Sequence, residues 1–127
     1  MRLLLVDDSR AIRKQLPRLL SGLSGIGEVE VASDADSGLY AARELRPEVV
    51  IVDLDLRRSS MNGIELVTRL AGREPKPVLM VYTNHPELKE YALEAGADYF
   101  FDKGKETGDL METLRHLATN RRPSRHI

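Results

Sequence analysis

Two runs of four apolar residues, Leu3–Val6 and Val49–Val52, each lead directly into an aspartate. A third run, Val78–Tyr82, leads into a threonine, and a shorter one covers Tyr99–Phe101. Short, continuous apolar runs are typical of strands that are buried on both faces, whereas a half-exposed strand alternates between apolar and polar residues. Strands of this kind form parallel sheets whose two faces are covered by helices, which constrains the chain to an α/β fold.

The segments between the runs carry apolar residues at helical spacing. Ser9 is suited to cap the first helix, and Pro17 inside it is expected to produce a kink because proline removes a backbone donor. Further helices are predicted after Ser33-Asp34, over Gly63–Leu70, over about Pro86–Glu94 and along Leu110–Leu117, and Glu28–Ala32 alternates like a strand near a sheet edge. Five strands alternating with five helices predict a doubly wound, three-layer αβα fold around a five-stranded parallel sheet.

Composition excludes several classes of function. The 127 residues are 42% hydrophobic with a net charge of −1, which suits one domain with its own core and argues against a nucleic-acid partner. The absence of cysteine excludes disulfides, cysteine-ligated zinc and a thiol nucleophile. No apolar run approaches the roughly 20 residues that span a bilayer, and the N-terminus has no signal-peptide pattern, so we expect a cytoplasmic protein with no membrane segment.

Polar side chains follow four of the five predicted strands. Asp7 and Asp8 follow the first strand, Asp53 the third, Thr83 the fourth and Lys103 the fifth. In the flavodoxin-like strand order 2-1-3-4-5 these four strands are neighbours, so their carboxyl ends gather three carboxylates, a hydroxyl and an ammonium at one sheet edge. Each residue alone has a simpler explanation, such as a helix cap or a solvated side chain. The combination predicts a functional pocket.

The residue types in this pocket indicate phosphoryl chemistry. Clustered carboxylates repel one another, and an all-oxygen set suits Mg²⁺, here held by Asp8 and Asp53 with Asp7 acting through water. Asp53 is then the nucleophile that forms an aspartyl phosphate, and Lys103 and the Thr83 hydroxyl bind the other phosphoryl oxygens. We find no serine–histidine pair for hydrolytic triad chemistry.

Four motifs, Asp7-Asp8, Val50–Asp53, Val81–Thr83 and Phe101–Lys103, occur together in order. With them the chain resembles the response-regulator receiver domain of two-component phosphorelays over about residues 2–119. The resemblance implies a phosphoacceptor signalling module that catalyses only its own phosphotransfer and dephosphorylation. Asp53 would accept the phosphoryl group from a histidine kinase or a histidine phosphotransfer protein.

The resemblance also implies ligand and switch residues. Mg²⁺ would be bound by Asp8, Asp53 and the backbone carbonyl of Asp55. Phosphorylation would draw the Thr83 hydroxyl inward and change the rotamer of Phe100. That remodels the face formed by the fourth helix, fifth strand and fifth helix, where partner proteins bind and through which some receivers form homodimers.

The sequence departs from the family pattern at several positions near the pocket. The loop from Asp53 to Gly63 is two residues longer than usual, with a basic stretch over residues 57–62 that either reshapes kinase recognition or is a tolerated insertion. Gly104 replaces the proline that usually follows the lysine, which puts a cis peptide there in doubt. Asn84, after Thr83, would narrow access to the phosphoryl group.

Two further positions flank the site and, in the family, tune how long the phosphate persists. Asp55 and His85 occupy them here, and a surface salt bridge between the two is the simpler alternative. Two other functions stay open. One is a degenerate receiver that binds a partner without phosphorylation. The other is a haloacid-dehalogenase-type phosphatase, suggested by Asp53-Leu54-Asp55, although that family places the motif on its first strand.

The sequence divides into a receiver domain over residues 1–119 and a basic tail over residues 120–127. The tail carries three arginines and no acidic residue, and we expect it to be a disordered, solubilising end. The chain length leaves no room for an output domain. We therefore expect a stand-alone receiver that signals through a partner protein.

Overall fold

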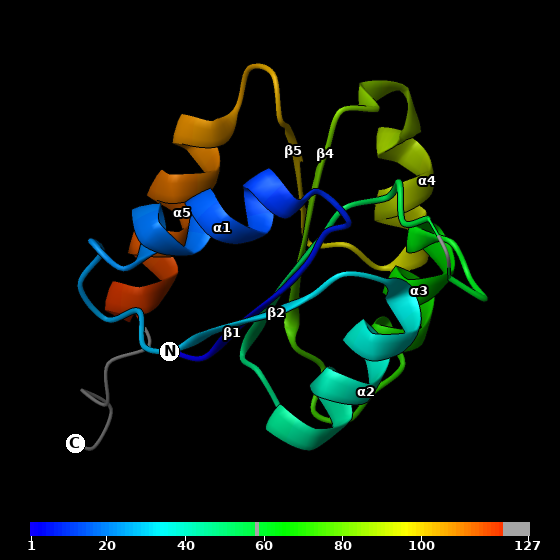
Figure 1. Cartoon of the computed structure of the whole chain (residues 1–127), viewed down its shortest axis with the longest axis horizontal. Coiled ribbons are helices and arrows are strands. Elements are labelled where there is room, and N and C mark those ends of the chain that lie inside the picture. The colour runs from blue at the N-terminus through cyan, green and yellow to red at the C-terminus, as the bar shows by residue number, and fades with distance from the viewer. Residues whose placement is uncertain (58, 121–127) are drawn as a thin grey trace.

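The computed structural model describes residues 1–57 and 59–120, which form a sheet with helices on both sides (Figure 1). The strands are β1 (Leu3–Val6), β2 (Val29–Ala32), β3 (Val49–Val52), β4 (Val78–Thr83) and β5 (Tyr99–Asp102). The helices are α1 (Arg10–Leu20), α2 (Ala35–Leu45), α3 (Gly63–Ala71), α4 (Lys89–Ala95) and α5 (Thr107–Asn120). All strand pairs are parallel, in the order β2-β1-β3-β4-β5, which confirms the predicted fold.

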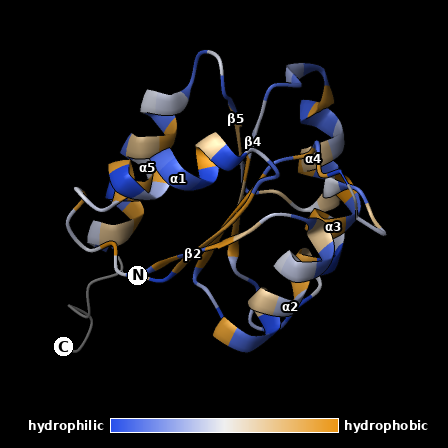
Figure 2. Cartoon of the chain, viewed as in Figure 1, coloured by the Kyte–Doolittle hydropathy of each residue, from blue (hydrophilic) through white to orange (hydrophobic). Residues whose placement is uncertain are grey.

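Two hydrophobic clusters cover the two faces of the sheet. One face packs against α1 and α5, through residues such as Leu16, Leu20, Leu110 and Leu114. The other packs against α2, α3 and α4 and includes Leu66 and Leu70. In Figure 2 the hydrophobic residues follow the strands and the inner sides of the helices, while the hydrophilic residues face outward. The three central strands are therefore buried on both sides, as their continuous apolar runs require.

The strand register determines which residues reach the carboxyl edge together. Val6 pairs with Val52, Val52 with Val81, and Val81 with Phe100, so these four residues form one row across the sheet. The backbone pairing continues one residue further, because the Asp53 N–H donates to the Val6 carbonyl at 2.9 Å. The residues that directly follow β1 and β3 therefore lie side by side at the carboxyl edge of the sheet.

Local sequence signals set the starts of three helices. Ser9, Asp34 and Asn62 each accept a hydrogen bond from a backbone N–H three residues on, which caps α1, α2 and α3. The helix α1 continues through Pro17 to Leu20.

The structure departs from the predicted elements in one region. The helix expected over Pro86–Glu94 is divided into a 3₁₀ turn, Pro86–Leu88, and α4. Proline is tolerated in the first turn of a helix but supplies no N–H, and a short 3₁₀ turn commonly begins an α-helix.

Three other predictions from the sequence concern the end of the domain, the C-terminal tail and membrane-spanning segments. The helix α5 extends to Asn120, one residue past the expected domain boundary, and residues 121–127 of the predicted tail lie outside the described residues. Within residues 1–57 and 59–120, no helix is both long enough and apolar enough to cross a bilayer.

Candidate functional site

The acidic residues predicted to lie together do so at the carboxyl edge of the sheet. Asp7, Asp8 and Asp53 each offer a carboxylate oxygen, and the three oxygens lie within 4.8 Å of one another. Asp7 is fully buried and Asp53 is 4% exposed, whereas Asp8 is half-buried. The all-oxygen donor set and the partial exposure of Asp8 fit Mg²⁺, which binds carboxylates and keeps several waters.

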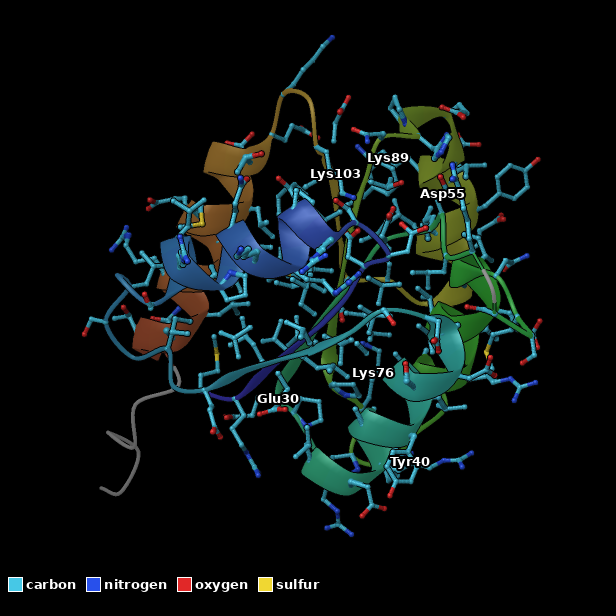
Figure 3. The ribbon with its side chains drawn as sticks, viewed as in Figure 1. Glu30, Tyr40, Asp55, Lys76, Lys89 and Lys103 are labelled. Atoms are coloured by element: carbon cyan, nitrogen blue, oxygen red, sulfur yellow. The ribbon has the colours of Figure 1, made fainter. Side chains whose placement is uncertain are left out.

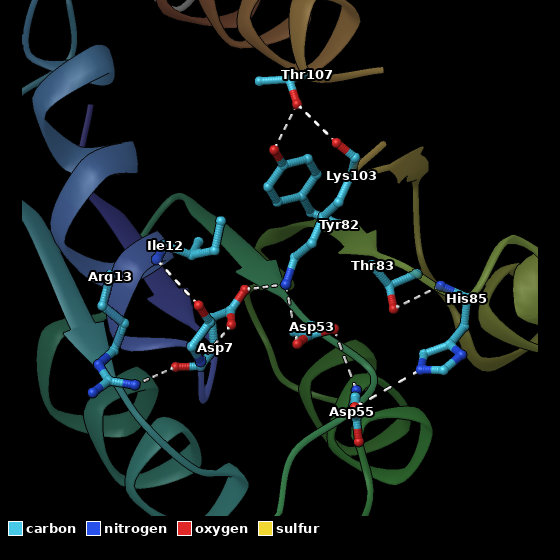
Figure 4. A network of polar contacts seen from close by, with 11 residues as sticks. Asp7, Ile12, Arg13, Asp53, Asp55, Tyr82, Thr83, His85, Lys103 and Thr107 are labelled. Carbon is cyan, nitrogen blue, oxygen red and sulfur yellow. Dashed lines mark hydrogen bonds and ion pairs between the residues drawn. The ribbon is translucent and has the colours of Figure 1, made fainter. Parts of the chain in front are cut away.

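Lys103 reaches into the acidic cluster from the loop after β5. Its Nζ lies 2.7 Å from Asp7 Oδ2 and donates a hydrogen bond to Asp53 Oδ2 at 3.2 Å (Figure 4). Burial lowers the pKa of Lys103, but the contacts with Asp7 and Asp53 outweigh this and hold that pKa above its ordinary value. The lysine is therefore charged and compensates part of the negative charge of the cluster.

Asp7 holds the most buried carboxylate of the cluster. Its Oδ1 accepts a hydrogen bond from the Ser9 N–H at 2.8 Å, and Oδ2 contacts Lys103 without the geometry of a hydrogen bond. Burial raises the pKa of Asp7, even though the contact with Lys103 and the Ser9 N–H act in the opposite direction. A buried carboxylate with an incompletely satisfied oxygen is one that a cation stabilises.

The cluster opens into a small pocket at the surface. Its volume is about 130 Å³, and its lining residues are Asp8, Ser9, Asp53, Asp55, Asn84, His85 and Lys103. Figure 3 shows Lys103 and Asp55 in the upper half of the view and Lys76, which precedes β4, in the lower half. Asn84 is one of the residues that line this pocket.

The two expected switch residues are not on the pocket surface. Thr83 is fully buried, and its hydroxyl accepts a hydrogen bond from the His85 N–H at 3.4 Å. Phe100 is half-buried and packs against the hydrophobic cluster on the side of α2, α3 and α4. Both residues lie on neighbouring strands, β4 and β5, next to the acidic site.

Two side chains, those of His85 and Arg57, approach the Asp55 carboxylate at the mouth of the pocket. Its Oδ2 lies 3.8 Å from His85 Nε2 and 3.7 Å from the Arg57 guanidinium. Its backbone N–H donates to Asp53 Oδ1 at 3.3 Å. The structure therefore contains the Asp55–His85 contact expected as the simpler alternative, and adds Arg57 to it.

The longer loop between β3 and α3 is attached to the start of α2. The hydroxyl of Ser59 accepts a hydrogen bond from the Ala35 N–H at 2.8 Å. The Asp36 carboxylate accepts two more from Ser60, one from its N–H at 2.9 Å and one from its hydroxyl at 2.5 Å. These bonds lower the pKa of Asp36. Sequence reasoning missed this attachment, because it joins polar residues 24 positions apart.

The loop after β5 has its own hydrogen bonds. The peptide between Lys103 and Gly104 is trans, and the cis peptide among the described residues is Glu74-Pro75. Asp102 Oδ1 accepts from the Gly104 N–H at 2.7 Å, and Glu106 Oε1 accepts from the Asp102 N–H at 2.8 Å. Sequence reasoning did not single out these acidic residues, although an aspartate two residues before a glycine is a known turn signal.

Comparison with known proteins gives relatives along almost the whole chain. A protein-glutamate methylesterase/protein-glutamine glutaminase of Anaeromyxobacter dehalogenans is 37% identical over 126 residues, which are 95% of this chain and 35% of the relative. The positive alginate biosynthesis regulatory protein of Pseudomonas aeruginosa is 32% identical, over 98% of this chain and 49% of the relative. The chain thus spans between a third and a half of the length of these curated relatives.

Solved structures have the same fold. A receiver domain protein from Methanospirillum hungatei superposes with a TM-score of 0.80 at 27% identity, over 97% of both chains. A two-component response regulator from Aurantimonas superposes with a TM-score of 0.82 at 28% identity, over 95% of this chain and 86% of that one. The family described as the response regulator receiver domain matches residues 3–115. The chain therefore belongs to the response regulator receiver domains, which are phosphoacceptor signalling modules and not true enzymes.

Proposed function

We propose that this chain accepts a phosphoryl group on Asp53 in an Mg²⁺-dependent reaction and that phosphorylation switches its binding to a partner protein. The observation that carries the proposal is the position of Asp53. Its carboxylate lies within 4.8 Å of those of Asp7 and Asp8, and its Oδ2 accepts a hydrogen bond from Lys103. One nucleophile, a metal-binding set and a fixed cation are thus assembled at the opening of one pocket.

The residues of the pocket have distinct roles in the proposed transfer. Asp8, Asp53 and the backbone carbonyl of Asp55 hold Mg²⁺, with Asp7 acting through water, and the ion neutralises charge on the phosphoryl oxygens when it is bound. A carboxylate oxygen of Asp53 attacks the phosphorus, the new P–O bond forms, and the bond to the donor breaks with its electron pair leaving on the donor. Lys103 pairs with a phosphoryl oxygen as the charge shifts from the donor to Asp53.

The donor and the receiving partner are proposed from the family. The donor is a histidine kinase or a histidine phosphotransfer protein, whose phosphorylated imidazole supplies the phosphoryl group. The partner binds the face formed by α4, β5 and α5, through which some receivers of the family also form homodimers. Tyr91, Leu93 and Tyr99 are exposed there, and this provides apolar surface for a protein contact.

The proposed switch begins at the buried Thr83. Its hydroxyl moves towards the phosphoryl group on Asp53, and Phe100 on the neighbouring strand changes its rotamer. The two residues are diagonal neighbours on the same face of the sheet, because Val81 pairs with Phe100 and Thr83 with Asp102. The Thr83→Ala variant is expected to accept phosphate but to lose the phosphorylation-dependent change in partner affinity.

Asp55, His85 and Asn84 are proposed to set the lifetime of the aspartyl phosphate. All three line the same pocket as Asp53, and a water molecule that attacks the phosphoryl group would have to enter through this pocket. The Asp55→Asn and His85→Ala variants are expected to change the rate of dephosphorylation. Unchanged rates in both would leave their contact as a surface ion pair only.

The proposed acceptor is tested by intact-protein mass after incubation with acetyl phosphate, with and without Mg²⁺. We expect one phosphoryl adduct that requires Mg²⁺ and is lost in Asp53→Asn. The matched control is Asp109→Asn, an exposed aspartate on α5, which should keep the adduct. No adduct and no Mg²⁺ binding would favour a degenerate receiver that binds its partner without phosphorylation.

The phosphatase alternative has no support from the fold. Asp53-Leu54-Asp55 follows the third strand, and the family match covers the motif within residues 3–115. We expect no turnover of a generic phosphate ester.

A further inference from the structure

Lys103 needs an accurately placed backbone to reach its two carboxylates. Its side chain is 9% exposed and inserts between Asp7 and Asp53. A lysine has four flexible carbons, and the glycine that follows it, Gly104, restricts the backbone less than any other residue. The position of Lys103 therefore depends on what holds its main chain.

Both polar groups of the Lys103 backbone are bound. Its N–H donates to the Thr83 carbonyl at 2.9 Å, and its carbonyl accepts from the Thr107 hydroxyl at 3.3 Å. The same Thr107 oxygen lies 2.7 Å from the hydroxyl of Tyr82, on β4 (Figure 4). A chain of two hydrogen bonds thus connects β4 to the Lys103 carbonyl.

The direction of these bonds follows from counting protons. A carbonyl only accepts, so the single hydroxyl proton of Thr107 is directed to Lys103. The contact between Tyr82 and Thr107 must then use the proton of Tyr82, with Thr107 as acceptor. Hydrogen bonds ordered in this way polarise one another, so the phenol strengthens the hold of Thr107 on the lysine loop.

Tyr82 also contacts the other end of Lys103. The ammonium lies 5.7 Å from the centre of the Tyr82 ring, and the tyrosine is 4% exposed. Val52 pairs with Val81, so Tyr82 occupies the row of Asp53, one residue past the last pair. One aromatic side chain therefore lies beside the ammonium and is linked through Thr107 to the carbonyl of the same lysine.

Thr107 differs from the other helical threonines of the described chain. Thr68 and Thr119 are exposed and Thr113 is half-buried, and each hydroxyl donates to the carbonyl four residues back, a common bond in helices. Thr107 makes the same type of bond, and it alone among these four threonines has a second partner, Tyr82. A simple helix-end interaction does not require that second bond.

We propose that Tyr82 and Thr107 are positioning residues that hold Lys103 in the geometry needed for phosphoryl transfer to Asp53. The inference rests on the proposed function, since it assigns Lys103 a part in the transfer.

The first test measures the rate of Asp53 phosphorylation by acetyl phosphate at saturating Mg²⁺. Thr107→Val keeps the shape of the side chain and removes the hydroxyl, so we expect a loss of about 2- to 10-fold, the range of one net hydrogen bond. Thr107→Ser should restore the rate, and Tyr82→Phe should lose less than Thr107→Val. The control is Thr113→Val, which removes an equivalent bond from the same helix and should leave the rate unchanged.

Two further readouts separate positioning from general destabilisation. The affinity for Mg²⁺ should not change in Thr107→Val, because the hydroxyl is not part of the acidic cluster. In a Lys103→Met background, Thr107→Val should cause no additional loss of rate, because the residue through which it acts is absent. The inference would be overturned if Thr113→Val lowered the phosphorylation rate as much as Thr107→Val does. It would also be overturned if Thr107→Val lowered the rate by the same factor in the Lys103→Met background as in the wild type.

Amide hydrogen exchange tests the anchor independently of phosphorylation. Thr107→Val should speed exchange at Lys103, Gly104 and Lys105 by about 2- to 10-fold, while Thr113→Val should not. A wild-type chain that takes up no phosphoryl group would refute the proposed function, and the exchange rates would still decide whether Thr107 holds the loop. Unchanged exchange at these three amides would refute the anchor itself.

Discussion

The contact between Gly63 and the backbone after Asp53 makes a sharp prediction about the acidic site. Gly63 is the first residue of α3. A Cβ at this position would lie 2.5 Å from the Cα of Leu54, 2.7 Å from the Asp53 carbonyl oxygen and 2.9 Å from that of Leu54. All three are main-chain atoms, so no side chain can rotate away to make room.

The size of the effect follows from these distances. Ordinary contact begins at 3.4 Å, so Gly63→Ala must separate α3 from Leu54 by about 0.9 Å. Such overpacking costs about 1–3 kcal/mol of stability. The displaced segment carries Asp53 itself, and a misplacement of about 1 Å is enough to slow a reaction about 100-fold. We therefore expect folded Gly63→Ala to be phosphorylated about 100-fold more slowly than the wild type.

The assay is the rate of adduct formation with acetyl phosphate, with unfolding in urea to correct for the folded fraction. Gly72→Ala is the first control, because its Cβ would meet the Arg69 carbonyl oxygen at an ordinary 3.6 Å. Gly96→Ala is the second control. It has a φ of +118° and a clash with Ala71 at 2.5 Å, so it should lose stability and keep its rate. Equal rates in folded Gly63→Ala and Gly72→Ala would refute the reasoning.

Three other predictions concern charge and metal. Burial raises the pKa of Asp7, so the ionised form of this residue opposes folding. In urea titrations of the metal-free protein at neutral pH, Asp7→Asn should therefore have a higher free energy of unfolding than the wild type. This difference in free energy should shrink as the pH falls through the raised pKa of Asp7. Hydrogen bonds from Ser60 lower the pKa of Asp36, so their stabilisation of the fold is complete above the ordinary aspartate pKa. Ser60→Ala should therefore have a lower free energy of unfolding than the wild type, and this difference should disappear as the pH falls through the lowered pKa of Asp36. Mg²⁺ at 100 times its dissociation constant should add about 2.7 kcal/mol to the free energy of unfolding, and Asp8→Asn should remove most of this gain in thermal scans.

The sequence was sufficient to predict the main parts of the acidic site. Continuous apolar runs identified the buried strands, and in a parallel sheet the residue after such a strand must lie at the carboxyl edge. The places of Asp7, Asp53 and Lys103 follow directly from this geometry, and Lys103 Nζ lies within 3.2 Å of a carboxylate oxygen of each aspartate. The prediction succeeded because the strand register, not a loop conformation, sets the positions of the aspartates.

Contacts between loops were beyond the reach of the sequence. Nothing in the local pattern indicates that Ser59 and Ser60 bond to the start of α2, since serines are common in loops and the pairing spans 24 residues. The division of the fourth helix into a 3₁₀ turn and α4 was also missed, because periodicity does not separate i+3 from i+4 bonding within a few residues. These features depend on how neighbouring loops pack.

Alternation along β4 gives the Tyr82–Thr83 pair a role that neither residue has alone. Successive side chains of a strand point to opposite faces, so Tyr82 packs with the cluster of α1 and α5, while Thr83 turns away from it. The Thr83 carbonyl binds the Lys103 N–H, and Tyr82 holds the Lys103 carbonyl through Thr107. The strand end proposed to respond to the phosphoryl group therefore also holds the lysine proposed to bind it. A movement of Thr83 towards Asp53 that also shifts its main chain is transmitted to Lys103 through this hydrogen bond. On this basis we expect Thr107→Val to weaken the phosphorylation-dependent change in partner affinity as well as the transfer rate.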